Sequence, residues 1–178
     1  MGLRELIKDE HLRTRLENIW NKIEKEFETR IKGEVTLQGF QHFKNVENNL
    51  EKLIKDKKFS DLEIFLLSVS ACLHDICKGV CKEGEDHGAK AADHILDERE
   101  FYGLNKQEAA AIASICAAHS VKSLNTKNTR IGKVKEKIAI GSEVVNLWKL
   151  SAVFILADTL DTTIERFFGA FIEVAWQG

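Results

Sequence analysis

The stretch LEIFLLSVSACLHDI, residues 62–76, decides the fold of this chain. It is so rich in apolar residues that it predicts a helix buried in the core. His74 and Asp75 stand at its end, where a buried carboxylate and an imidazole both need partners. A divalent cation would satisfy both side chains at once. The alternative is a helix end at which the histidine caps carbonyl groups and the aspartate faces water.

The other periodic segments also predict helices, so the expected fold class is all-α, a compact bundle of about six to seven helices. The chain contains no proline, and its glycines cluster between the periodic segments. Residues 120–147 break the pattern and leave room for a short β-hairpin. The predicted helices cover residues 3–30 with a break near Asp9, about 40–56, 61–75, a stretch from Asp86, 106–119 and 148 to about 168.

A length of 178 residues suggests one main domain. We expect an N-terminal helical extension at 1–34, the main domain at 35–168 and a tail at 169–178. The tail is apolar, which suits a packed last element, an oligomer contact or a truncated end.

Composition excludes several classes of protein. The formal net charge is −2 and the pI is near 6.3, which gives no electrostatic basis for general nucleic-acid binding or for binding an anionic membrane. The first thirty residues are charged throughout, unlike a signal peptide, and the apolar run at 147–160 is too short to span a bilayer. We expect a soluble, cytoplasmic protein with four reduced cysteines.

Four more residues of metal-ligand type fall at helix ends or on an apolar face. His42 lies near the start of the second predicted helix, His87 opens the fourth, His119 ends the fifth and Asp158 interrupts the apolar face of the last. Histidines at the ends of several helices can point into one shared pocket of a bundle. A metal bound there would also neutralise the buried carboxylates.

The order of these motifs resembles the HD superfamily of metal-dependent phosphohydrolases, over roughly residues 38–166. Cys77 stands where relatives often carry glycine, and the Gly-Tyr-Pro signature of cyclic-di-GMP phosphodiesterases is absent, which argues against that substrate. The matching pieces are HFKNV at 42–46, LHDICK at 73–78, DHG at 86–88, AHS at 118–120 and LADTLD at 156–161.

The resemblance implies one or two divalent metal ions, which would be iron, manganese, nickel, cobalt, zinc or magnesium. A second ion would use His87 and His119, with Asp75 bridging the two ions. The implied ligands of the first ion are His42, His74, Asp75 and Asp158.

Two further residues have expected roles in catalysis beside Asp75. Lys78 lies about one helical turn beyond His74 and is placed to neutralise phosphate charge, although it also fits a solvated lysine at a helix end. Asp161 would orient a ligand or a water molecule, or else contact Thr163 or Arg166. His94 is expected to be a surface or supporting histidine rather than a ligand.

The expected function is hydrolysis of a phosphoester bond in a nucleotide or another small phosphorylated metabolite, by attack of a metal-activated water. The pattern does not separate phosphomonoesterase from phosphodiesterase activity, and it leaves a homo-oligomer open. The alternative is a catalytically weak HD domain that senses a ligand or regulates a larger signalling assembly. Basic residues in the long loop suit either phosphate contacts or a solvated face; they are Lys122, Lys127, Arg130 and Lys133.

Overall fold

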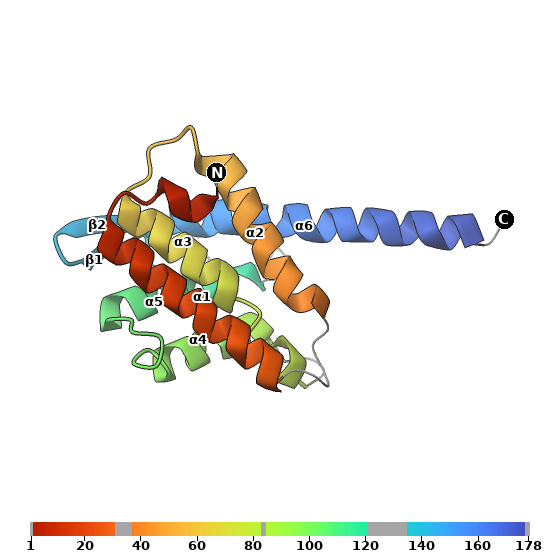
Figure 1. Ribbon diagram of the computed structural model, residues 1–178, viewed down its shortest axis with the longest axis horizontal. Helices are drawn as coiled ribbons and strands as arrows, with labels where there is room; N and C mark the ends of the chain where they lie inside the picture. Colours follow the sequence, from red (N-terminus) through yellow and green to blue (C-terminus); the bar gives the residue numbers. More distant parts are fainter. Residues whose placement is uncertain (1, 31–36, 83–84, 121–134, 177–178) are drawn as a thin grey trace.

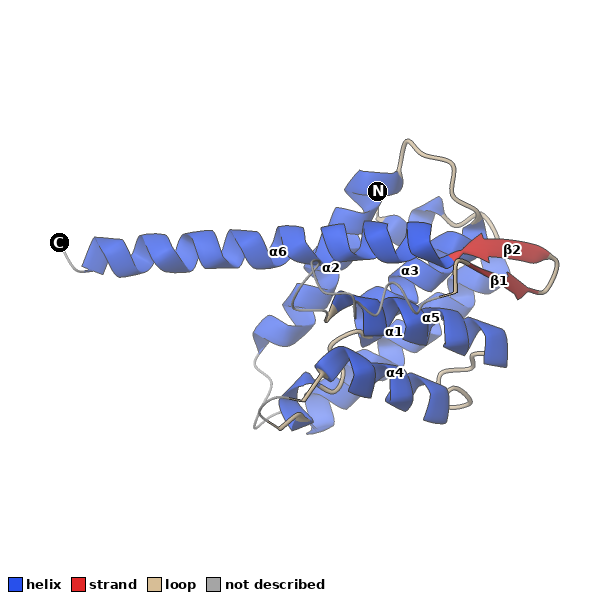
Figure 2. Ribbon diagram, turned by 180° about the vertical axis from the view of Figure 1, so that it is seen from behind, coloured by secondary structure: helices blue, strands red, loops and turns tan. Residues whose placement is uncertain are grey.

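The computed structural model describes residues 2–30, 37–82, 85–120 and 135–176, with side chains described for 2–26, 40–82, 85–120 and 135–161. These residues form six α-helices, two short 3-10 helices and one antiparallel hairpin. The predicted all-α bundle with a short hairpin is confirmed (Figures 1 and 2). The elements in chain order are η1 (Leu3–Leu6), α1 (Glu10–Arg30), α2 (Leu37–Ile54), α3 (Asp61–Leu73), η2 (Lys78–Val80), α4 (His87–Asp97), α5 (Lys106–His119), β1 (Lys137–Ile140), β2 (Glu143–Asn146) and α6 (Leu147–Trp176).

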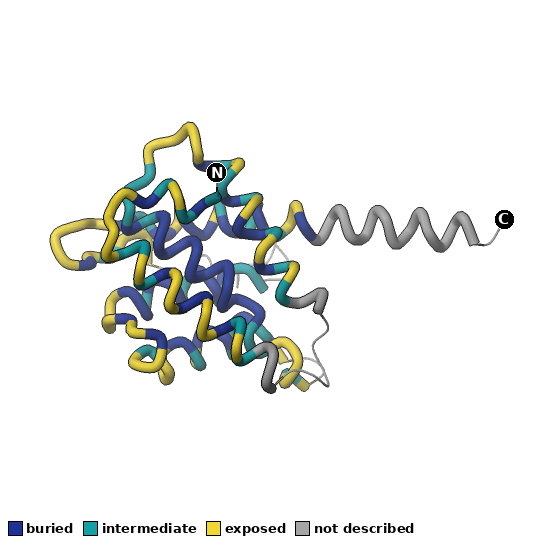
Figure 3. Tube along the Cα trace, viewed as in Figure 1, coloured by how far each residue is buried: buried dark blue, intermediate teal, exposed yellow. Residues whose placement is uncertain are grey.

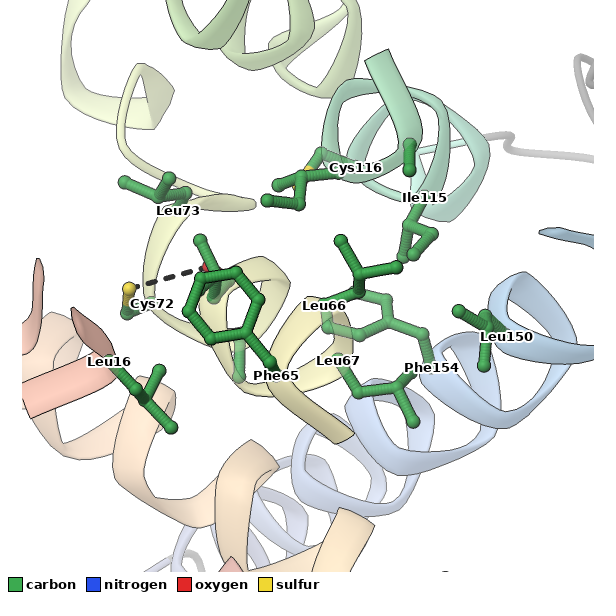
Figure 4. Packing of buried hydrophobic residues seen from close by; sticks show 14 of the residues in the cluster. Leu16, Phe65, Leu66, Leu67, Cys72, Leu73, Ile115, Cys116, Leu150 and Phe154 are labelled. Atoms are coloured by element: carbon green, nitrogen blue, oxygen red, sulfur yellow. Dashed lines mark hydrogen bonds between the residues drawn. The ribbon is translucent and has the colours of Figure 1, made fainter. Parts of the chain in front are cut away.

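Helix α3 is the centre of the bundle, as its sequence predicts. Every residue from Ile64 to Leu73 is buried, and α1, α2, α5 and α6 all contact this helix. Figure 3 shows α3 as a continuous buried segment among helices with exposed outer faces. Its side chains pack with Leu16 of α1, Ile115 of α5 and Phe154 of α6 (Figure 4). Burial on all sides places the end of α3 inside the protein.

The start of α3 is held by a capping box. The Ser60 hydroxyl accepts a hydrogen bond from the backbone N–H of Glu63 at 3.2 Å, and the Glu63 carboxylate accepts one from the N–H of Ser60 at 3.1 Å. The Asp61 carboxylate accepts hydrogen bonds from the N–H groups of Lys8 and Asp9, at 2.9 and 2.6 Å. The N-terminal end of α3 is therefore attached to the segment that links η1 and α1.

The N-terminal segment breaks where the sequence predicts, because η1 ends at Leu6 and α1 begins at Glu10. Its apolar side chains belong to the same hydrophobic core as α3. An ion pair joins Arg4 to the buried Glu47 of α2 at 3.0 Å, and the Ser68 hydroxyl of α3 donates to the same carboxylate at 2.5 Å. A partly buried polar network thus connects η1, α2 and α3.

The hairpin and the last helix follow one another without a break. Ile138 pairs with Val145 across the hairpin, and Gly141 adopts φ +58°, which its turn requires. Helix α6 continues to Trp176, beyond the predicted end near residue 168, so residues 169–176 are helical. Its C-terminal part extends past the bundle in Figures 1 and 2.

Leu96 of α4 is apolar but 41% exposed, so it lies on the side of the helix that faces away from the core. The basic loop residues Lys122, Lys127, Arg130 and Lys133 lie outside the described residues, as does the side chain of Arg166. No helix among the described residues is long and apolar enough to cross a membrane.

The capping box gives a test of this arrangement. Ser60→Ala removes the side-chain acceptor for the Glu63 N–H, so we expect a loss of about 1 kcal/mol in the free energy of unfolding. Urea denaturation measures this loss. The control is Ser142→Ala in the exposed hairpin turn, which should change stability by less than about 0.5 kcal/mol. Equal effects of the two substitutions would contradict the role of the cap.

Candidate metal centre

Six side chains from five helices converge on one point inside the bundle. His42 comes from α2, His87 is the first residue of α4, His119 is the last of α5, and Asp158 lies within α6. Helix α3 ends at Leu73, so His74 is its C-cap residue and Asp75 lies in the turn that follows. Three overlapping sets have ligand atoms within 4.8 Å of one another: His42, His74 and Asp75; His74, His119 and Asp158; and Asp75, His87 and His119.

Backbone carbonyl groups orient two of the imidazoles. Nδ1 of His74 lies 3.0 Å from the carbonyl oxygen of Ala71, and Nδ1 of His119 lies 2.5 Å from that of Cys116. A carbonyl oxygen only accepts hydrogen bonds, so each Nδ1 carries the proton and donates it. In the neutral ring this leaves an unprotonated Nε2, the form that binds a metal ion, and both Nε2 atoms face the shared centre.

His42 is oriented from the side opposite to the centre. Its Nδ1–H donates to a carboxylate oxygen of Asp161 at 2.6 Å, and its Nε2 lies 3.2 Å from Oδ1 of Asp158. The same Nε2 is 3.0 Å from Nε2 of His74. If both rings are neutral, these two nitrogens present lone pairs to each other. This geometry therefore requires a cation between them, either a proton on His42 or a metal ion.

The two oxygens of Asp75 face two different sets of histidines. Oδ2 lies 3.7 Å from Nε2 of His74 and 3.9 Å from that of His42. Oδ1 lies 3.4 Å from Nε2 of His87 and 3.3 Å from that of His119. The carboxylate thus stands between His42 and His74, which we call the first set, and His87 and His119, which we call the second set. A carboxylate that bridges two cations occupies such a position.

Aromatic rings exclude water from the inner side of the centre. Phe43 and Phe154 pack edge-on against His74, with ring centroids 5.3 and 5.4 Å away. The His74 side chain is only 1% exposed, and burial lowers its pKa to about 4 against the charge of Asp75. His74 is consequently neutral at physiological pH, which is the state that a metal ligand needs.

His42 and Asp75, in contrast to His74, are charged. Burial alone would lower the pKa of His42, but hydrogen bonds to Asp158 and Asp161 outweigh it and raise this pKa to about 9. Burial disfavours ionisation of Asp75, yet His74, His119 and Lys78 together lower its pKa well below the ordinary value. The site thus holds ionised carboxylates and a protonated His42.

The donor set fits a divalent metal ion. Imidazole nitrogens and carboxylate oxygens suit borderline and hard cations, and a protein site that lacks thiolate disfavours the softer ones. None of the three sets contains a cysteine within the described side chains. Cys81 instead donates its S–H to the carbonyl oxygen of Cys77 at 3.0 Å. The chemistry of the site therefore agrees with the predicted divalent cation.

The HD-CE family matches residues 33–173 of this sequence. The chain belongs to the HD-CE family. The matched range includes all the converging residues and begins after α1. No solved structure matches the chain.

Lys78 of this HD-CE domain reaches the centre differently from the sequence-based expectation. It does not continue the helix of His74, because α3 ends at Leu73 and Lys78 begins η2. Its ammonium group contacts Oδ2 of Asp75 at 2.7 Å, and its side chain is 61% exposed whereas that of Asp75 is 7% exposed. Lys78 therefore lies at the boundary between the buried site and solvent.

Asp161 contacts the centre through His42, whereas His94 lies apart from it. Asp161 is buried and contacts Nδ1 of His42, which is the position expected of a residue that orients a ligand; the side chains of Thr163 and Arg166 lie outside the described residues. His94 is in none of the three sets. It forms a hydrogen bond with the Tyr102 hydroxyl at 2.9 Å.

Sequence reasoning missed residues that hold the ligand helices in register. Asn49 of α2 donates from its side-chain amide to the carbonyl oxygen of Ala157 in α6 at 3.0 Å. That contact lies next to Asp158 and sets the position of α6 against α2. Phe154 is one of many apolar residues in α6, and its packing against His74 depends on how α6 crosses α3. No pattern in the sequence marks either contact.

The raised pKa of His42 links the stability of the metal-free protein to pH. Its folded pKa of about 9 exceeds the ordinary value of 6.5, so its contribution to stability is complete below pH 6.5 and is lost as the pH rises through 9. With a chelator present, we expect the melting temperature to fall over that interval. Asp161→Asn removes a partner that raises this pKa, so the fall should be smaller. An equal fall in both proteins would refute the linkage.

Proposed function

We propose that this chain is a metal-dependent phosphohydrolase of the HD superfamily, which uses one or two divalent cations to hydrolyse a phosphoester. The observation that supports this proposal most directly is the position of Asp75. Its two oxygens face separate groups of imidazole nitrogens at 3.3–3.9 Å. A site for two ions needs a ligand shared between them, and a carboxylate with one oxygen towards each group can be that ligand.

The residues divide into two groups by what they would hold. His42, His74, Asp75 and Asp158 would hold the first ion, and His87 and His119 would hold a second together with Asp75. Bound divalent cations would supply Lewis acidity towards a phosphoryl oxygen and would lower the pKa of the attacking water. The chain itself keeps the imidazoles oriented and keeps water away from their inner side. Asp161 has a supporting role, because it fixes His42 through Nδ1.

Lys78 is the cationic side chain best placed to meet the substrate. Its exposed ammonium group lies against Asp75, and a bound metal ion would compete with it for Oδ2. Lys78 would then turn towards an anion at the mouth of the site. We propose that it neutralises the negative charge of the phosphoryl group in the transition state.

The proposed substrate class is a nucleotide or another small phosphorylated metabolite. The net charge of −2 makes a polyanion an unfavourable partner for the chain as a whole. A compact phosphate, by contrast, needs only local positive charge, which the metal ions and Lys78 would provide. This choice of substrate rests on the resemblance to phosphohydrolases and on the charge of the site.

Metal content and turnover test the proposal together. Protein purified without chelator should carry one or two transition-metal ions per chain and should hydrolyse a generic phosphomonoester or phosphodiester. Asp75→Asn should remove the bound metal and reduce turnover to background. The control is Asp93→Asn, which changes an exposed carboxylate on α4 and should leave both quantities unchanged.

Two results would contradict the proposal in different ways. Protein that stays metal-free and inactive after addition of manganese, iron, nickel or magnesium would exclude the metal-dependent hydrolase. Protein that binds metal and nucleotide without turning the nucleotide over would instead favour a ligand-sensing or regulatory domain.

Replacement of Lys78 separates metal binding from catalysis. Lys78→Ala should retain the bound metal, because the lysine is not a ligand, and should lower kcat by about 100-fold. Steady-state kinetics and metal analysis on the same sample measure both effects. Lys82→Ala is the matched control, since Lys82 is exposed and nearby in sequence. A kcat unchanged by Lys78→Ala would remove this residue from the mechanism.

A further inference from the structure

The two histidines of the second set stand at helix ends that pack against each other. His87 opens α4 and His119 closes α5, and the two helices lie side by side (Figure 2). Their rings meet edge-on with centroids 5.0 Å apart. Because terminal residues have fewer helical hydrogen bonds than interior ones, such a pair needs additional contacts to stay in place.

Gly88 allows the closest approach between these helix ends. A Cβ atom on Gly88 would lie 2.7 Å from the carbonyl oxygen of Cys116 and 2.5 and 2.8 Å from Oγ and Cβ of Ser120. These separations are shorter than van der Waals contact, and the carbonyl belongs to the helix backbone, so it cannot turn aside as a flexible side chain would. Gly88 has no positive φ, so close packing rather than backbone conformation accounts for glycine here.

The carbonyl group that Gly88 touches is the one that orients His119. Nδ1–H of His119 donates to the carbonyl oxygen of Cys116 at 2.5 Å. Gly88 is also the residue directly after His87. One backbone contact therefore joins the position of the first histidine to the orientation of the second.

A hydrogen bond between Ser120 and Asp86 also joins the end of α5 to the start of α4. Asp86, the N-cap of α4, accepts a hydrogen bond from the N–H of Ala89 at 2.9 Å. The same oxygen, Oδ1, accepts a hydrogen bond from the hydroxyl of Ser120, the C-cap of α5. The neighbours of both histidines are thus bonded to each other, with Asp86 before His87 and Ser120 after His119.

We infer that Gly88, Asp86 and Ser120 are positioning residues that hold His87 and His119 as one preassembled pair facing Oδ1 of Asp75. His42 does not depend on them, because Asp161 of α6 orients its ring. The ring of His74, by contrast, lies against that of His119, with centroids 4.8 Å apart. The effect of these three residues on metal binding rests on the proposed function, whereas their effect on the positions of the two imidazole rings does not. Loss of the contact should displace His87 and His119 and leave the ring of His42 unchanged.

Gly88→Ala tests the inference, because helix propensity and packing predict opposite results. Alanine favours a helix more than glycine does, so propensity alone would stabilise α4. Packing predicts that the new methyl group pushes the Cys116 carbonyl away from Gly88. The matched control is Ala89→Gly in the same turn, which weakens the helix without adding bulk. It should lower thermal stability and leave the histidine rings in place.

The direct measurement is the NMR signal of each imidazole in the metal-free protein. The chain has six histidines, so their ring nitrogens can be assigned one by one. In Gly88→Ala we expect the signals of His119 and His87 to shift most and that of His42 to stay. The signal of His74 should shift less, because its ring lies against that of His119. Unchanged His119 and His87 signals, or equal shifts in all four rings, would overturn the inference. Ser120→Ala adds no bulk and should shift the same two rings by less, which keeps the test available if Gly88→Ala fails to fold.

Manganese titration followed by calorimetry gives the second measurement. If the wild type binds two ions, Gly88→Ala should weaken the second by about tenfold or more and leave the first unchanged. Two ions bound with wild-type affinity would overturn the inference. A wild type that binds fewer than two ions would count against the dinuclear form of the proposed function, and the NMR result would then decide the positioning role by itself.

Discussion

The structure depends on one constraint, which is that Asp75 must remain ionised inside the protein. Its carboxylate follows the most buried helix of the bundle and is 7% exposed. An isolated charge at such a depth would cost several kcal/mol. Four imidazoles and the ammonium group of Lys78 surround it. The ends of α3, α4 and α5 therefore meet at this carboxylate together with faces of α2 and α6.

The imidazoles around Asp75 are oriented so that their Nε2 lone pairs face one another, and this arrangement favours a cation between them. Each of the three imidazoles with an identified Nδ1 partner uses its N–H outside the centre. Their Nε2 atoms consequently bring lone pairs towards one another and towards Asp75. A proton on His42 relieves part of this repulsion, and a divalent ion would relieve it more completely. The stability of the metal-free protein and the proposed affinity for a metal ion thus depend on the same geometry.

The two halves of the centre are built by different means. The first half is buried and oriented by Asp161, by a carbonyl of α3 and by Phe43 and Phe154. The second half is assembled from two helix ends, and the His87 side chain is 30% exposed. A half-site at helix ends relies on local packing between those ends, which explains why a glycine without any special φ lies there.

Patterns within the chain predict the buried helix, most helix bounds, the hairpin and the six polar residues that are anomalous for a helical core. These features are local, since they depend on periodicity, capping chemistry and the cost of burying charge. The early end of α3 and the contact of Lys78 with Asp75 are local, but no pattern in the sequence marks them. Tertiary structure alone decided the exposure of Leu96 and the close approach of Gly88 to Cys116. Each depends on how two helices cross, and a crossing is set by many side chains that lie far apart in the chain. The residue types were readable from the sequence, whereas the direction in which each Nε2 points required the fold.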